Sequence, residues 1–231
     1  MKKRLVFLSG AGISAESGLK TFRDSDGLWN GYNIEEVATP RAFAQNPQRV
    51  LDFYNMRRRD VFLAQPNAAH RAIAELEAMY DVVVITQNID DLHERAGSTN
   101  ILHLHGEITM MRSVTDPSIR SVIRGDIQLG DHAPDGGQWR PDIVWFEEPV
   151  PMIDMAAAEI VLADWLVVIG TSLQVYPAAG LIHYAKPEAQ KFVIDRSIPS
   201  IPAALGFQPI EATATEGMQL LIQQINEKCP V

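Results

Sequence analysis

Short, almost wholly apolar runs alternate with longer amphipathic segments along this chain. The runs at residues 4–9, 81–86, 165–170 and 191–195 are rich in Val, Ile, Leu and Phe and predict buried strands, and residues 101–104 predict another. Between them, helical periodicity predicts helices at residues 47–63, 67–79, 152–163 and 217–228. This alternation is typical of an α/β fold, with a parallel sheet and helices on both faces.

Two segments do not fit the simple alternation. Residues 27–64 form a long, largely helical excursion before the second strand. Residues 107–143 are rich in Asp, Gly, Pro and Arg, and this stretch is too long for an ordinary loop. We therefore expect residues 1–106 and 144–231 to form one Rossmann-like domain, and residues 107–143 to form a small inserted lobe.

Composition narrows the class of protein. The chain has 231 residues, 46% of them hydrophobic, which is enough for one large domain and a small lobe. Its formal charge of −9 does not favour a nucleic-acid partner, and no apolar run approaches the length of a membrane span. The basic start Met1–Arg4 is followed by too short an apolar run for a signal peptide, and Cys229 is the single cysteine. These features predict a cytoplasmic protein without a membrane segment, an internal disulfide or a thiolate metal site.

The first predicted strand runs directly into a glycine-rich turn. Gly10, Gly12 and Ala15 fit the Gly-x-Gly-x-x-Gly/Ala pattern, in which glycines permit a tight turn and a helix N-terminus faces a pyrophosphate. The pattern alone is weak. Its continuation through Ser17-Gly18 to Phe22-Arg23 makes it much more specific, because an ordinary Rossmann turn does not need those residues.

Polar residues follow three other predicted strands. They are Gln87, Asn88 and Asp90, then Gly170, Thr171 and Ser172, and finally Asp195. The carboxyl ends of parallel strands meet at one edge of the sheet, so these residues predict a shared ligand cleft. An Asp at the end of a strand can accept hydrogen bonds from ribose hydroxyls. The alternatives are helix capping for the Asn and Asp residues and an ordinary turn for Asp195.

Two histidines lie near the end of the 101–104 strand. If the strand continues, His103 and His105 point to opposite faces and do not form a metal pair. Most isolated histidines are structural. Gly106 ends the strand at the expected cleft and favours a functional role for His105.

Together, these motifs resemble the sirtuins, which are NAD-dependent protein-lysine deacylases. The matching pieces occur in the family's order and span nearly the whole chain. They are Gly10–Ser14, Ser17-Gly18, Phe22-Arg23, Gln87–Asp90, Leu104–Gly106, Arg140-Pro141, Val144–Phe146 and Gly170–Leu173.

The resemblance implies that NAD is the cofactor and acyl-lysine proteins are the substrates. His105 would be the general base and Asn88 a catalytic partner, with nicotinamide and O-acyl-ADP-ribose as products. Val144 and Phe146 would contact an extended substrate peptide. The residues implied to contact NAD are Gly10, Ala11, Gly12, Ser14, Ala15, Phe22, Arg23, Gln87, Asn88, Ile89, Asp90, Gly170, Thr171, Ser172, Asp195 and Ala214.

The chain also departs from the family. Sirtuins usually hold a structural zinc with four cysteines in the small lobe, whereas Met110–Ser113 stands where the first pair would begin, so we expect no metal. Asp126, Asp131, His132 and Asp135 could hold a harder ion but are more typical of solvated loops, and we expect apolar packing through Trp139 and Ile143 to stabilise the lobe. The family's Phe-Gly-Glu is Phe146-Glu147-Glu148, its Pro-Asp before Phe-Arg is Lys20-Thr21, and its strand-end Asn is Asp195.

One helix carries a further clue to the substrate. Tyr54 and Arg57 are three residues apart and share a helix face. From the residues alone, an amphipathic helix with a solvated basic end at Arg57–Arg59 is favoured, but Tyr-x-x-Arg at this place resembles the sirtuins that remove succinyl and malonyl groups. A phenol and a guanidinium can both bind a distal carboxylate. The alternative to deacylation is an NAD- or ADP-ribose-binding module, or an ADP-ribosyltransferase, that does not deacylate protein.

Overall fold

Within the described residues, six strands form a parallel sheet that makes up one half of the molecule. The computed structural model describes residues 2–21, 28–29 and 32–228. The strand order is β11-β10-β9-β1-β4-β5, and every neighbouring pair is parallel. The strands are β1 (Arg4–Ser9), β4 (Asp81–Thr86), β5 (Ile101–His103), β9 (Trp165–Ile169), β10 (Gln190–Asp195) and β11 (Gln208–Glu211).

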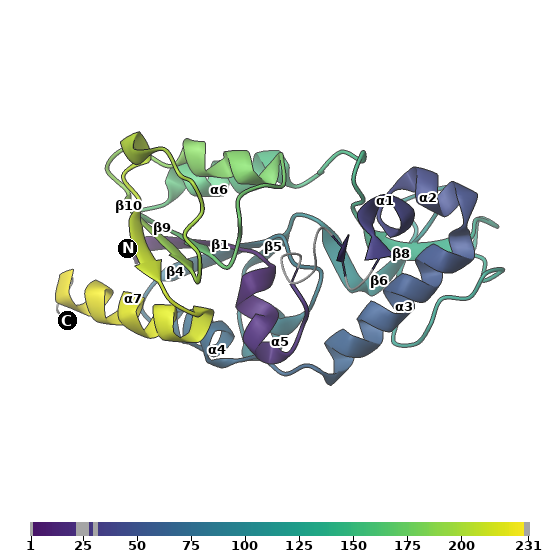
Figure 1. Ribbon diagram of the computed structural model, residues 1–231, viewed down its shortest axis with the longest axis horizontal. Coiled ribbons are helices and arrows are strands. Elements are labelled where there is room, and N and C mark those ends of the chain that lie inside the picture. Colours follow the sequence, from purple (N-terminus) through teal and green to yellow (C-terminus); the bar gives the residue numbers. More distant parts are fainter. Residues whose placement is uncertain (1, 22–27, 30–31, 229–231) are drawn as a thin grey trace.

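Helices cover both faces of this sheet because its strands are apolar on both sides. In β1, Leu5 and Phe7 pack on α4 (Ala68–Leu76) and α7 (Ala214–Lys228). Val6 and Leu8 pack on the opposite face, against α6 (Ile153–Leu162) and the short helix η2 (Ala178–Tyr184). Figure 1 shows α6 on one side of the strands and α4 and α7 on the other. The α/β fold with a parallel sheet is therefore confirmed.

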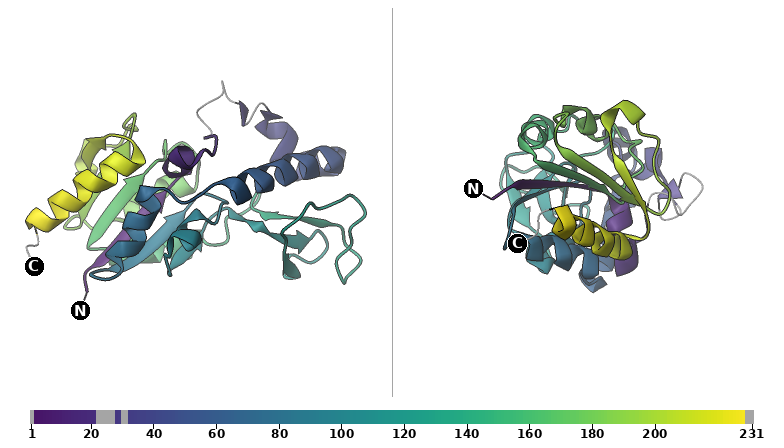
Figure 2. Two further views of the ribbon diagram at one scale, coloured as in Figure 1. Left: turned by 90° about the horizontal axis from the view of Figure 1, so that it is seen from below. Right: turned by 90° about the vertical axis from the view of Figure 1, so that its left-hand side faces the viewer.

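The other end of the molecule holds shorter elements around a long helix (Figures 1 and 2). An antiparallel sheet has the order β7-β6-β8, and α3 packs on β6 and β8. The elements are β2 (Leu28–Trp29), β3 (Tyr32–Asn33), α1 (Ile34–Val37), α2 (Pro40–Gln45), α3 (Pro47–Leu63), β6 (Gly106–Ser113), β7 (Arg120–Val122) and β8 (Trp139–Ile143). The short helix α5 (Leu92–Ala96) lies beside α4 (Figure 1). Two further short helices are η1 (Ala11–Ser17) and η3 (Ala203–Leu205).

One face of α3 holds the antiparallel sheet and its loops by hydrogen bonds to backbone. The Asn55 side chain donates to the Ile127 carbonyl and accepts from the Ile127 N–H, both at 2.9 Å. Arg58, which is 1% exposed, donates from Nε to the Ile108 carbonyl at 2.8 Å and from Nη1 to the Gly125 carbonyl at 3.1 Å. Ile108 and Ile127 are fully buried, so the bonds to them give partners to backbone groups that water cannot reach.

The expectation that apolar packing through Trp139 and Ile143 stabilises residues 107–143 agrees with the structure for Ile143 only. Ile143 is buried in a cluster with Ile108, as expected, but Trp139 is only partly buried. Buried polar contacts supply much of the remaining attachment. Apolar periodicity cannot reveal such contacts, because their donors and acceptors come from distant segments.

Several expected elements differ from the structure. Residues 107–143 contain most of β6 together with β7 and β8, which were not predicted because their polar and apolar residues are mixed. The strand β11 was not predicted either. The helix expected after the glycine-rich turn is present as a seven-residue 3-10 helix, η1. The C-terminal helix begins at residue 214 instead of 217, and the 101–104 strand ends at His103. Among the described residues, no helix combines the length and hydropathy that a membrane crossing requires.

Candidate active site

A cavity of about 460 Å³ lies at the carboxyl ends of the parallel strands, between them and the end of the molecule that contains α3. It is the cleft that the strand-end residues predict. Every predicted site residue in the described part of the chain lines it, whereas Phe22 and Arg23 lie outside the described residues. The predicted residues that line the cavity are Gly10, Ala11, Gly12, Ser14, Ala15, Tyr54, Arg57, Gln87, Asn88, Ile89, Asp90, His105, Val144, Phe146, Gly170, Thr171, Ser172, Asp195 and Ala214.

The glycine-rich turn packs directly on the loop that follows β9. The Gly12 N–H donates to the Gly170 carbonyl at 2.8 Å. A Cβ added at Gly12 would lie 2.7 Å from the Gly170 Cα, and one added at Gly10 would lie 2.7 Å from the Thr171 Cβ. The loops after β1 and β9 can therefore come this close only because both positions are glycine. The sequence pattern alone does not reveal this requirement.

Ser14, Asn88 and Asp90 form a buried polar group in the cavity wall. The Ser14 hydroxyl donates to the Asp90 carboxylate at 3.0 Å and accepts from the Asn88 amide at 3.1 Å. Burial raises the pKa of Asp90 to about 6, although bonds from Ser14 and the Leu92 N–H favour its charged form. A carboxyl group with this pKa can donate or accept a hydrogen bond near neutral pH, which suits it to bind an amide.

His105 is oriented by the turn after β4. Its Nδ1 lies 3.0 Å from the Gln87 carbonyl, which can only accept, so Nδ1 carries the proton and Nε2 is the free basic nitrogen. Burial lowers the pKa of His105, and the Gln87 contact offsets this only partly, so the ring is neutral at physiological pH. A neutral, oriented imidazole in a cavity can accept a proton.

His103 has a different setting. Its Nδ1 lies 3.3 Å from the Asn88 carbonyl, and its Nε2 lies 2.6 Å from the Glu94 carboxylate. Burial lowers its pKa, but the Glu94 contact outweighs this effect and the net pKa is raised. His103 is not among the residues lining the cavity. The strand ends between the two histidines, so strict alternation of faces does not describe them.

Tyr54 and Arg57 reach the cavity from α3. They are 1% and 6% exposed, and both line it. Burial strongly raises the pKa of Tyr54, which therefore stays a neutral phenol, and burial lowers the pKa of Arg57. The Trp145 ring lies beside Tyr54, with 6.3 Å between the ring centroids. The arrangement leaves a guanidinium in the wall of a largely apolar pocket.

Residues 143–148 form the wall opposite the parallel sheet. The Val144 N–H donates to the His105 carbonyl at 2.9 Å, and the Phe146 N–H donates to the Ala38 carbonyl at 3.0 Å. These two backbone donors of the wall therefore already have acceptors within the chain. Glu147 has a φ of 73°, in the left-handed region that favours glycine.

The far side of the cavity has chemistry that fits a dinucleotide. Asp195 lines it at the end of β10, where a carboxylate can accept from ribose hydroxyls, and Ala214 lies at the start of α7. The Glu16 carboxylate accepts from the Thr215 N–H at 2.9 Å and from its hydroxyl at 2.6 Å, which joins η1 to the start of α7. Sequence patterns did not reveal Glu16, because its partner is 199 positions away.

The acids considered for a harder ion have other roles. Asp126 pairs with Arg59 at 2.7 Å, and Asp135 accepts from the Ser113 hydroxyl. Asp131 accepts from the Gln128 N–H at 2.8 Å. Within the described part of the chain, no group of three or more His, Cys, Asp or Glu residues is placed to hold a metal ion.

Comparison with known proteins identifies the family. The model of the Sir2 family matches residues 10–177. A Helicobacter pylori protein named NAD-dependent protein deacylase is 53% identical over 225 residues, which cover 97% of this chain and 98% of that protein. A Bacteroides thetaiotaomicron protein of the same name is 47% identical over 227 residues, covering 96% and 97%.

Solved structures agree with this match. A Sir2 homologue in complex with ADP-ribose superimposes with a TM-score of 0.89 at 39% identity, covering 98% of this chain and 93% of that one. A Sir2 homologue in complex with NAD gives a TM-score of 0.86 at 39% identity, covering 98% and 91%.

Proposed function

The chain belongs to the Sir2 family, and from this premise we propose that it removes acyl groups from protein lysines with NAD, and removes succinyl and malonyl groups faster than acetyl. The deacylase names of its relatives and their coverage support NAD-dependent protein deacylation as the activity. The acyl preference rests on α3. A cytoplasmic location remains a prediction from the composition.

The loop residues of the cavity would hold NAD. The turn from Gly10 to Gly12 and the nearby Ser172 would take the pyrophosphate, and Asp195 would take ribose hydroxyls. Asp90, whose pKa is raised to about 6 by burial, would hold the nicotinamide carboxamide with Asn88 beside it. When bound, NAD supplies an electrophilic ribose carbon as nicotinamide departs, and it accepts the acyl group.

His105 would move the proton that the reaction requires. Nδ1 is tied to the Gln87 carbonyl, so Nε2 is the atom that would take a proton from a ribose hydroxyl. The lowered pKa keeps Nε2 unprotonated near neutral pH. Because the Val144 N–H bonds to the His105 carbonyl, the base and the substrate wall share one backbone contact.

The observation that carries the acyl preference is the guanidinium of Arg57 in the cavity wall. Tyr54 and Arg57 both line the cavity, and both are nearly buried. A carboxylate at the end of an acyl chain would gain charge-assisted hydrogen bonds there. An acetyl group offers no such partner and leaves the guanidinium without that carboxylate. Differential binding of this kind separates substrates by their ratio of kcat/KM.

Kinetics on matched peptides test the preference. We expect the wild-type protein to have a higher kcat/KM on a succinyl- or malonyl-lysine peptide than on the acetyl-lysine peptide of the same sequence. Arg57→Met should reverse this order. Arg59→Met is the matched control, because it removes the same charge from an exposed position of the same helix.

Equal rates on both peptides that Arg57→Met leaves unchanged would show that Arg57 does not read the acyl end. Mass spectrometry of the products separates deacylation from the alternative. O-acyl-ADP-ribose forms only if the acyl group moves to the nucleotide, whereas an NAD-binding module would leave the acyl peptide intact.

A further inference from the structure

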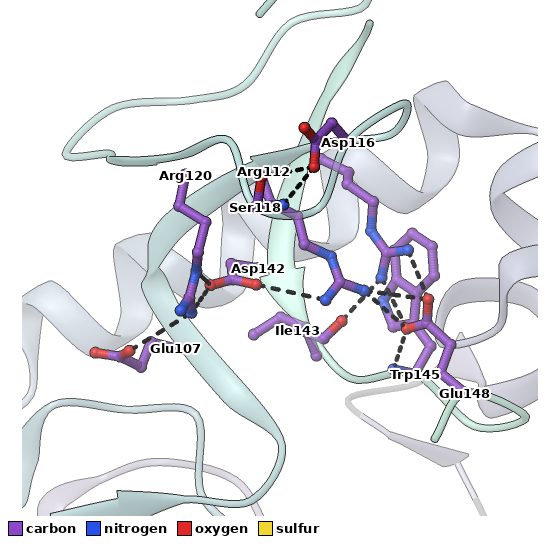
Figure 3. A network of polar contacts seen from close by, with 10 residues as sticks. Glu107, Arg112, Asp116, Ser118, Arg120, Asp142, Ile143, Trp145 and Glu148 are labelled. Carbon is purple, nitrogen blue, oxygen red and sulfur yellow. Dashed lines mark hydrogen bonds and ion pairs between the residues drawn. The ribbon is translucent and has the colours of Figure 1, made fainter. Parts of the chain in front are cut away.

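A network of charged residues adjoins and includes part of the wall formed by residues 143–148. Its members Arg140 and Asp142 are buried, whereas Arg120 is exposed. It runs across β7, β6 and β8 to the segment after β8, and consists of Glu107, Arg112, Arg120, Arg140, Asp142 and Glu148. Figure 3 shows that it has two parts joined by Arg112: Glu107, Arg120 and Asp142 on one side, and Glu148 with Trp145 on the other. Trp145 and Glu148 of the second part line the cavity, whereas Glu107, Arg120 and Asp142 of the first part do not.

Arg140 and Glu148 form the centre of the second part. Arg140 Nη1 donates to Glu148 Oε1 at 2.9 Å, and Nη2 donates to Oε2 at 3.0 Å, so the pair is bidentate. Arg112 Nη2 donates to the same carboxylate at 3.1 and 3.2 Å. Burial raises the pKa of Glu148, but the bonds from Arg140 and the Trp145 N–H outweigh it, and the net pKa is lowered. The carboxylate therefore remains charged.

The same pair also holds the backbone of the wall at two points. Arg140 Nη2 donates to the Ile143 carbonyl at 2.8 Å, and Glu148 Oε2 accepts from the Trp145 N–H at 2.8 Å. The Arg140–Glu148 pair thus bonds to the backbone of Ile143 and of Trp145, the residues directly before and after Val144. With Val144 tied to the His105 carbonyl, the wall has little freedom relative to the base.

Arg140 also sets the position of an aromatic ring. Its guanidinium carbon lies 3.2 Å from the centroid of the Trp145 ring, which is 3% exposed. The Trp145 ring also packs on the Phe43 ring, with 5.3 Å between the ring centroids, and it lies beside Tyr54. A displacement of the guanidinium would therefore move the ring that borders the expected acyl site.

From these contacts we infer that Arg140 and Glu148 are positioning residues for the acyl-lysine side of the site. They hold the segment from Ile143 to Trp145, and through it Tyr54, in the geometry that binds an acyl-lysine peptide. Among the described residues, the hydrogen bonds of this pair involve neither the glycine-rich turn nor the strand ends where NAD would lie. This inference rests on the proposed deacylase function but not on the preference for succinyl over acetyl.

The substitutions Arg140→Gln and Glu148→Gln test the inference, and Arg120→Gln is the matched control. Arg120→Gln removes the same charge as Arg140→Gln from the same network, where it pairs with Asp142 and not with the wall. Three quantities are measured for each: KM for the peptide that the wild type uses best, kcat, and the Kd of ADP-ribose by calorimetry. Thermal unfolding reports the general loss of stability.

We expect the two wall variants to raise the peptide KM on the order of tenfold, the effect of losing one or two buried hydrogen bonds. Their Kd for ADP-ribose should stay within about twofold of the wild-type value. In Arg120→Gln, the peptide KM and the Kd for ADP-ribose should both stay within about twofold of the wild-type values. If Arg140→Gln does not bind ADP-ribose because it is unfolded, Glu148→Gln decides, since its amide can still accept from the Trp145 N–H. A peptide KM raised equally in Arg120→Gln, or unchanged in Glu148→Gln, would overturn the inference.

Arg140→Lys separates positioning from simple charge. Lysine keeps the positive charge but cannot bond Glu148 and Ile143 in the same fork. If the pair acts by geometry, the peptide KM of Arg140→Lys stays close to that of Arg140→Gln. Restoration to the wild-type value would show that charge alone is needed, which contradicts a positioning role. Equal wild-type rates on succinyl and acetyl peptides would refute the acyl preference but leave this comparison intact.

Discussion

The buried carboxyl of Asp90 should make the protein less stable at neutral pH than it is with an amide at this position. Burial raises the pKa of Asp90 from an ordinary value of 3.8 to about 6. The unfolded chain therefore releases this proton at lower pH than the folded chain does. As pH rises from 4 to 6, ionisation favours the unfolded state, and stability is lost over that interval.

The size of the effect can be worked out from the shift. A change of about 2 pKa units corresponds to about 3 kcal/mol, since one unit is worth about 1.4 kcal/mol. Asp90→Asn removes the ionisation but keeps an oxygen that can accept from the Leu92 N–H, as the Asp90 carboxylate does at 3.2 Å. The variant should therefore be more stable than the wild type by up to about 3 kcal/mol at pH 7 to 8 and by about 0 at pH 4.

Urea unfolding of both proteins at intervals between pH 4 and pH 8 measures this difference. Other groups that titrate in this range, such as the buried His70, are present in both proteins and largely cancel. Deacylation should fall in the variant, because Asp90 is expected to hold the nicotinamide amide, so stability and activity would change in opposite directions. A stability difference that does not vary with pH would refute the reasoning, because it would mean that Asp90 is not desolvated in the folded protein.

Three further outcomes are expected. His105→Ala should lower kcat by about 100- to 10,000-fold while the Kd of ADP-ribose stays close to the wild-type value, and near-normal turnover would make His105 structural. Elemental analysis of purified protein should find no stoichiometric zinc, and about one zinc per chain with loss of stability on chelation would contradict this. Glu147→Gly should raise the free energy of unfolding by about 1 kcal/mol, because the φ of 73° at Glu147 favours glycine, and thermal unfolding measures this change. A destabilised variant would mean that the Glu147 side chain contributes more stability than the backbone strain costs.

The sequence predicted five of the six parallel strands, all except β11, because each of those five is a short apolar run. A run such as Val82–Ile85 can only be buried on both faces, and it occupies the sheet as expected. The antiparallel strands β6, β7 and β8 could not be predicted in this way. Their residues alternate irregularly, and Arg112, Arg140 and Asp142 are stabilised by charged partners rather than by apolar packing.

The same distinction applies to the candidate site. Residues next to strand ends, such as Gln87 and Thr171, could be assigned to one cleft because parallel strands end at one edge. Glu16 and Glu148 could not, because each acts through a partner that only the folded chain brings near. The reason for Gly12 was also not visible, since its constraint comes from Gly170 in a distant loop.

The helix α3 carries two sets of contacts on neighbouring positions. Tyr54 and Arg57 line the cavity, while Asn55 and Arg58, one residue further along, hold the antiparallel sheet and its loops. Each residue added to a helix rotates all later positions by about 100° around the helix axis. A single insertion or deletion between Pro47 and Tyr54 would therefore rotate both sets away from their partners at once. The number of residues in this part of α3 is therefore fixed by two sets of contacts made from adjacent positions of the same helix.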